Sequence, residues 1–89
     1  MSEINLKQAA CIAERYLNEF VRTSYNSPPD DKWVVLVESA VDCGEYWMFH
    51  YQSAMYLSAG KLSYLLAGNL PLKISKMGDV LGFGASFAG

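Results

Sequence analysis

The chain has 89 residues, of which 52% are hydrophobic and 18% charged, and its formal net charge at pH 7 is −2. This composition is typical of one small globular domain and excludes a disordered chain. Phosphate binding needs clustered Lys and Arg, and the seven basic residues form no cluster, so we expect no nucleic-acid partner.

Two further features bear on the setting of the chain. No apolar run approaches the roughly 20 residues of a membrane span, and residues 1–5 lack the regions of a signal peptide, so we expect a cytoplasmic protein with no membrane partner. Cys11 and Cys43 have no spacing typical of a metal or redox site. We expect two free thiols rather than a disulfide, with Cys11 buried and Cys43 the more exposed.

Residues 5–22 show the clearest helical pattern. Asn5 is a suitable N-cap, and Gln8 three residues later completes a capping box. Apolar side chains recur at steps of three and four. They are Leu6, Ala9, Ala10, Ala13, Tyr16, Leu17 and Phe20. The pattern predicts an amphipathic helix that covers a core.

Two strands are predicted next. Residues 23–32 form a polar loop, because Pro28 and Pro29 prevent the helix from continuing. Residues 33–40 and 46–53 have strand composition, and the segment 42–44 between them is a hairpin turn in which Gly44 can adopt a positive φ. The two strands are therefore expected to pair antiparallel.

The alternation of side chains assigns two faces to this hairpin. The face toward the helix is expected to carry Trp33, Val35, Val37, Trp47, Phe49 and Tyr51. The opposite face is expected to carry Val34, Leu36, Glu38, Tyr46, Met48 and His50. This mixed outer face is either a partner-binding surface or a surface covered by another segment or a second copy.

The second half of the chain completes the predicted fold. Residues 54–67 are expected to form two short helical pieces broken at residues 59–60. After the stop signal Gly68-Asn69, residues 70–76 and 80–87 are predicted strands around a turn at residues 77–79, with Leu81, Phe83 and Ala85 pointing inward. The fold class is therefore α+β: a long N-terminal helix on an antiparallel sheet of about four strands, with a short helical segment between strands 2 and 3.

Catalytic chemistry finds little support in the sequence. His50 has no Cys or carboxylate at a spacing that implies a ligand set or a triad. No phosphate-binding loop and no nucleophile elbow is present, so we expect neither an enzyme nor a bound cofactor or metal. A small enzyme would have to use His50 or the carboxylates in a cleft.

Acidic residues dominate one region. Between positions 30 and 45 there are five carboxylates and one basic residue, Lys32. These carboxylates are Asp30, Asp31, Glu38, Asp42 and Glu45. They are either solvated turns and strand ends or an acidic rim that steers a basic partner into contact.

One stretch carries a family resemblance. The segment 46–57, with Trp47, Phe49, Gln52, Ser53, Tyr56 and Leu57, is followed by Ala67-Gly68-Asn69, Pro71 and a turn at Gly78. In this order the motifs resemble the immunity protein 35 family, and with the preceding helix and strand the resemblance covers nearly the whole chain. Members often carry a further helix after the last strand, and we expect no such helix within residues 87–89.

The resemblance implies a single immunity-type domain over residues 1–89 that binds and neutralises a cognate bacterial toxin. It implies structural roles for Trp47, Phe49, Tyr56, Leu57, Gly68, Asn69, Pro71 and Gly78. We expect the toxin contact on the variable surface instead. The residues expected there are Asp30, Asp31, Glu38, Asp42, Glu45, Tyr46, Met48 and His50. The alternative is a chaperone-like or scaffold domain that acts through the outer sheet face as a homo-oligomer, such as a homodimer.

Overall fold

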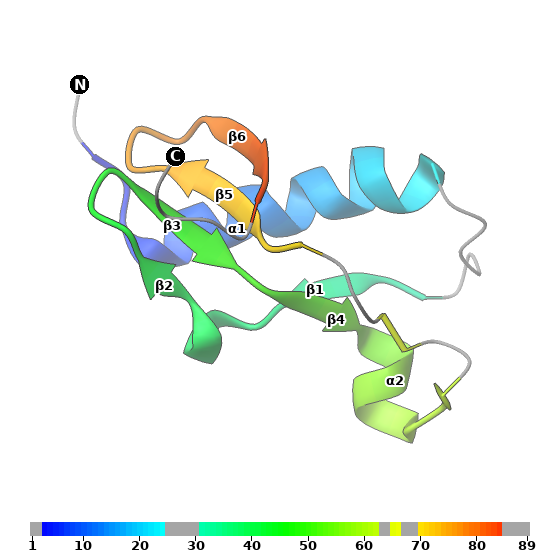
Figure 1. Cartoon of the computed structure of the whole chain (residues 1–89). Coiled ribbons are helices and arrows are strands. Elements are labelled where there is room, and N and C mark those ends of the chain that lie inside the picture. The colour runs from blue at the N-terminus through cyan, green and yellow to red at the C-terminus, as the bar shows by residue number, and fades with distance from the viewer. Residues whose placement is uncertain (1–2, 25–30, 63–64, 67–69, 85–89) are drawn as a thin grey trace.

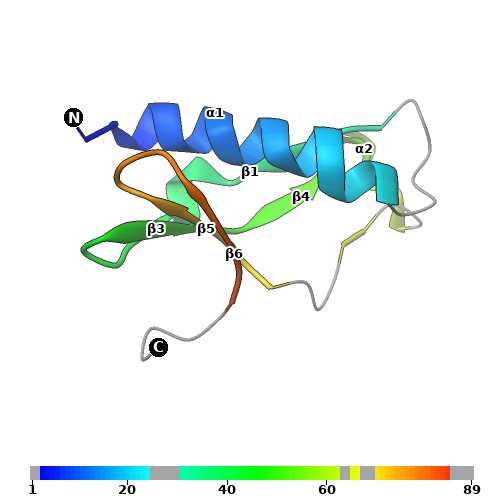
Figure 2. The same cartoon turned by 90° about the horizontal axis from the view of Figure 1, so that it is seen from above.

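A computed structural model describes residues 3–24, 31–62, 65–66 and 70–84. One long helix lies across one side of two small antiparallel sheets, and a short helix closes the end of the hairpin (Figure 1). The view from above shows the long helix running along the strands (Figure 2). The predicted α+β class is confirmed.

Helix α1 (Leu6–Tyr16) begins at the predicted capping box. The Asn5 side chain accepts the Gln8 N–H at 2.8 Å, and the Gln8 side chain accepts the Asn5 N–H at 2.9 Å. Its buried face consists of Ala9, Ala10 and Ala13, whose small side chains let the helix backbone lie close to the strands. The helix continues as a π-helical turn (Leu17–Val21) and a 3₁₀ turn (Arg22–Ser24).

The strands form two sheets. One has the order β1-β4 and the other β2-β3-β5-β6, and all pairs are antiparallel. Their bounds are β1 (Trp33–Val35), β2 (Val41–Asp42), β3 (Tyr46–Phe49), β4 (Tyr51–Ser53), β5 (Leu72–Ser75) and β6 (Val80–Phe83).

The predicted hairpin is confirmed, but each of its two strands is broken once. The first is interrupted by a 3₁₀ turn (Val37–Ser39), where the Ser39 hydroxyl and N–H both bond to the Leu36 carbonyl at 3.0 Å. The second is interrupted at His50. Pairing continues across the break, because the Leu36 N–H donates to the His50 carbonyl at 2.8 Å. The four expected strands therefore become six, in two sheets.

The core lies between α1 and the inner faces of both sheets. Trp33, Val35, Trp47, Phe49 and Tyr51 are buried there, as their alternation predicted. Val37 is the exception: the 3₁₀ turn ends the alternation, and its side chain is 43% exposed. Leu17, Leu72 and Ile74 complete the centre of the core and are fully buried.

Strand β6 departs from its predicted face. Leu72 pairs with Phe83 and Lys73 with Gly82, but Ile74 pairs with Val80, so Leu81 is an extra residue at a β-bulge. Gly82 has a φ of 104°, which a residue with a side chain rarely adopts. The expectation that Leu81 points inward is wrong, and its side chain is 52% exposed. Phe83 meets the Tyr51 ring edge-on at 6.1 Å but is 39% exposed, and Ala85 lies outside the described residues.

Helix α2 (Ala54–Ala59) is the first of the two expected helical pieces. The Ser53 side chain caps its start, and Gly60 ends it with a left-handed backbone at φ 66°. Pro71 stands at the entrance to β5, and Gly78 forms the β5–β6 turn with φ 96°, both as predicted. Gly68 and Asn69 lie outside the described residues. Within the described part of the chain, no helix is long and apolar enough to cross a membrane.

Candidate functional site

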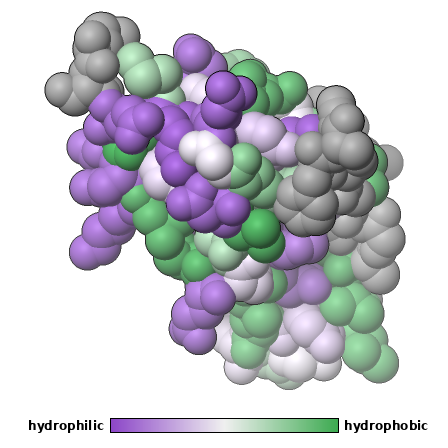
Figure 3. Space-filling view, turned by 60° about the vertical axis from the view of Figure 1, so that its left-hand side comes forward, coloured by the Kyte–Doolittle hydropathy of each residue, from purple (hydrophilic) through white to green (hydrophobic). Residues whose placement is uncertain are grey.

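A groove of about 600 Å³ lies beside the outer face of β1. We call it the outer groove and define it by its lining residues, which are Val34, Val35, Leu36, Val37, Glu38, Ser39 and Leu57. It is open and mostly apolar. On the face shown in Figure 3, several separate hydrophobic areas are exposed, with hydrophilic side chains between them.

The alternation of β1 explains why this groove is apolar. Trp33 and Val35 are buried in the core, so Val34 and Leu36 point to the other side and remain half-buried. The 3₁₀ turn then places Val37 at the surface, and α2 contributes Leu57, which is 52% exposed. Leu57 was expected to be a structural contact, and its exposure contradicts that expectation; Tyr56 beside it is half-buried.

The predicted outer face also included Tyr46, Met48 and His50 from the second strand, but these residues do not line the groove. Met48 is only 3% exposed, between Val41 on one neighbouring strand and Lys73 on the other, so it cannot offer a surface for a partner. Tyr46 is half-buried, with the Lys73 ammonium 5.2 Å from its ring centre. His50 is exposed, but none of the three lines the groove.

The predicted acidic residues separate into different roles. Glu38 lines the outer groove and is exposed. Glu45 is exposed in the β2–β3 turn. Asp42 is exposed but already occupied, because its carboxylate lies 3.0 Å from the Lys76 ammonium. Asp30 lies outside the described residues.

Asp42 also fixes the turn that follows it. Its carboxylate accepts the Gly44 N–H at 2.9 Å, and this hydrogen bond, followed by the one from Lys76, lowers the pKa of Asp42 below its ordinary value of 3.8. The same Lys76 ammonium lies 4.6 Å above the Trp47 ring. Asp42 therefore stabilises the hairpin end rather than presenting a free charge.

Asp31 corrects the prediction most clearly. It was expected on the acidic rim, but it is 6% exposed. Its carboxylate accepts the Ser53 hydroxyl at 2.7 Å and the Met55 N–H at 3.1 Å. A buried carboxylate needs such donors, so Asp31 joins the loop before β1 to the start of α2 and is structural.

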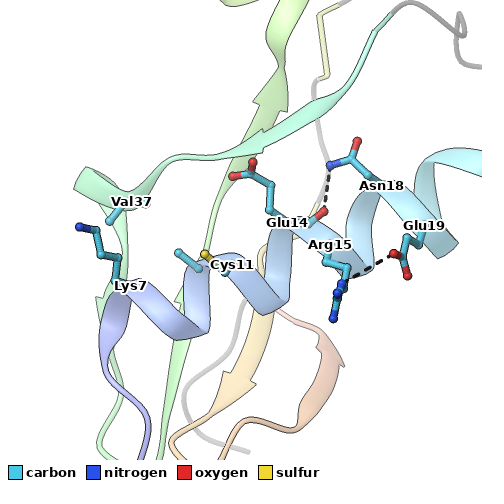
Figure 4. A pocket seen from close by; sticks show the side chains of 8 residues that line it. Lys7, Cys11, Glu14, Arg15, Asn18, Glu19 and Val37 are labelled. Carbon is cyan, nitrogen blue, oxygen red and sulfur yellow. Dashed lines mark hydrogen bonds and ion pairs between the residues drawn. The ribbon is translucent and has the colours of Figure 1, made fainter.

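A second hollow, of about 440 Å³, lies between α1 and the 3₁₀ turn (Figure 4). We call it the helix hollow; its lining residues are Lys7, Ala10, Cys11, Glu14, Arg15, Asn18, Glu19 and Val37. Charges of both signs alternate along it, and Arg15 pairs with Glu19 at 3.7 Å.

Both thiols are free as predicted, but the expected exposure is reversed, since Cys11 is exposed and Cys43 half-buried.

Two amide side chains have structural roles that the sequence did not predict, although Gln52 is one of the residues that carry the family resemblance. Gln52 on β4 binds the backbone of Leu66, accepting its N–H at 2.7 Å and donating to its carbonyl at 3.1 Å. Asn18 bonds the backbone of β1 in the same way. Asn is unfavourable inside a helix, and this is the feature of the sequence that could have indicated a structural role for Asn18.

Within the described residues, no group of three His, Cys, Asp or Glu side chains could hold a metal ion. Comparisons of the chain with protein-family models, curated proteins and solved structures gave no match.

Proposed function

We propose that this chain is a non-catalytic immunity protein that binds a cognate bacterial toxin in the cytoplasm and blocks it. The outer groove is the observation that carries the proposal. The groove is lined by apolar side chains and a single charged residue, Glu38. Strand β1, which forms one side of it, is held in place by the core on its inner face. Small apolar hollows with one or two polar groups are typical places where a partner side chain anchors. The resemblance to the immunity protein 35 family supplies the class of partner.

Binding would proceed in two parts. An apolar side chain of the toxin enters between Val37 and Leu57, whose exposed surface gains most from burial. Glu38 receives a Lys or Arg next to that side chain, and Glu45 adds to the negative field that guides the approach. Occlusion of the toxin surface is then sufficient, and no chemical step is required of this chain.

A chaperone-like or scaffold domain remains the second candidate, because further exposed leucines follow α2. Leu62 and Leu65 lie beyond Leu57 on the connection toward β5, and both are exposed. A surface of this kind binds many apolar segments with little selectivity. Selectivity therefore separates the two functions.

The deciding experiment is co-purification from the native host with tagged protein, followed by mass spectrometry. Two variants make it specific: Leu57→Gln alters the outer groove, and Leu81→Gln on β6 is its matched control, because both leucines are 52% exposed. We expect one stoichiometric partner with a toxin domain, lost with Leu57→Gln and kept with Leu81→Gln. Recovery of many unrelated proteins would favour the scaffold function. A single partner indifferent to Leu57→Gln would contradict the groove.

A further inference from the structure

The outer groove and the helix hollow adjoin at one residue. Val37 lines both of them, and its side chain is exposed. In Figure 4, Val37 lies beside Lys7 at one end of the helix hollow, and the ion pair of Arg15 with Glu19 lies at the other end. A partner that fills the outer groove therefore reaches the helix hollow by crossing an apolar side chain.

Opposite charges flank Val37 on this surface. Glu38 lines the outer groove, Lys7 lines the helix hollow, and both side chains are exposed. Among the residues that the structure describes, neither takes part in an ion pair, whereas Arg15 and Glu19 are paired with each other. Val37 thus lies between a positive and a negative charge that are both available to a partner.

The backbone of β1 beside the helix hollow is already bonded. The Asn18 side chain donates to the Trp33 carbonyl at 2.8 Å and accepts the Trp33 N–H at 2.9 Å. The Glu14 carboxylate accepts the Val35 N–H at 3.2 Å. Because α1 occupies this edge, a partner cannot be recognised by adding a strand to it. A segment that crosses here must be recognised through its side chains.

We propose that one continuous segment of the toxin crosses from the outer groove to the helix hollow and presents a basic, an apolar and an acidic side chain in that order. This inference rests on the proposed function and extends its contact surface. The basic side chain lies against Glu38, the apolar one covers Val37, and the acidic one pairs with Lys7. Complementary charges on both sides of an apolar contact fix the direction of the segment, since a segment with the opposite order is repelled at both ends.

The test measures affinity for the toxin domain recovered by co-purification, using Lys7→Glu and its matched control Lys32→Glu. Both lysines are exposed and both substitutions change the net charge equally, but Lys32 lines neither hollow. Lys7 lies in the first turn of α1, where the helix dipole favours a negative side chain, so Lys7→Glu should keep the fold. We expect the dissociation constant to rise about three- to tenfold with Lys7→Glu and to change little with Lys32→Glu or Lys7→Arg.

Amine labelling followed by mass spectrometry locates the contact. The Lys7 ammonium should react more slowly in the complex than in the free protein, and the Lys32 ammonium equally in both. Equal affinities of the two Glu variants, or labelling of Lys7 that the partner does not slow, would overturn this inference. If Leu57→Gln still weakens binding in that case, the outer groove stands and only its extension fails. If no toxin domain is recovered, the inference fails together with the proposed function.

Discussion

At the scale of single residues, carboxylates with the same sequence character do different work. Glu38 is exposed in the outer groove, whereas Asp31 is buried and bonded to Ser53 and Met55. Nothing in the local composition distinguishes the two, because the difference arises from donors on a segment more than twenty residues away. Charge counting locates the carboxylates in the sequence but does not predict which of them carry free charges in the structure.

Asp31→Ala should lower the free energy of unfolding by about 1–3 kcal/mol, since it leaves the buried Ser53 hydroxyl and the Met55 N–H without their acceptor. Urea denaturation measures this change. Glu38→Ala is the control, expected to stay within about 0.5 kcal/mol as an exposed substitution. Equal effects of the two substitutions would mean that the Asp31 bonds add nothing to stability.

Asp42 gives a prediction about pH. Its folded-state pKa is lowered by the Gly44 N–H and by Lys76, so its stabilising effect is present above 3.8 and is lost as the pH falls through the lowered value. Titration followed by NMR should place the Asp42 pKa below 3.8. Lys76→Met should raise it only in part, because the Gly44 hydrogen bond remains. Lys61→Met should leave it unchanged, and an Asp42 pKa at or above the ordinary value would refute this account.

At the scale of elements, helix α1 depends on small residues where it meets the strands. Ala13 is fully buried, so Ala13→Leu should force extra atoms into a packed contact and destabilise the fold by about 1–3 kcal/mol. Thermal and urea unfolding would measure the loss. Cys11→Leu places the same side chain on the exposed side of the helix and should change stability little. Similar losses in both variants would contradict a packing cause, because only the side chain at position 13 is buried.

The sequence predicted those elements whose signal is local. The capping box at Asn5, the turn at Gly44 and the buried alternation from Trp47 to Tyr51 needed only neighbouring residues. The interruptions were not predictable in this way. The bulge at Leu81 and the break at His50 depend on how β5 and β1 are placed beside them, and this placement is tertiary. The outer groove was half predicted for the same reason: Val34 and Leu36 follow from alternation, but Leu57 does not.

At the scale of the whole molecule, a net charge of −2 is small, so steering must come from local carboxylates. Glu38→Lys/Glu45→Lys should slow association with the partner recovered by co-purification, and the effect should shrink as salt is added. Stopped-flow or surface-binding kinetics would show it. Glu3→Lys, another exposed substitution, is the comparison. Association rates equal in all three proteins would remove steering from the mechanism.

The placement of the two tryptophans has an optical consequence. Trp33 stacks on Tyr51 at 5.6 Å and its backbone bonds to the Asn18 side chain, whereas Trp47 lies under the Lys76 ammonium at the opposite end of the hairpin. Intrinsic fluorescence therefore contains two signals from two regions. Trp47→Phe would leave an emission that reports on the β1 edge, and Trp33→Phe one that reports on the Asp42–Lys76 pair. The emission of the remaining tryptophan in each variant therefore reports on one region of the protein without an added fluorescent label.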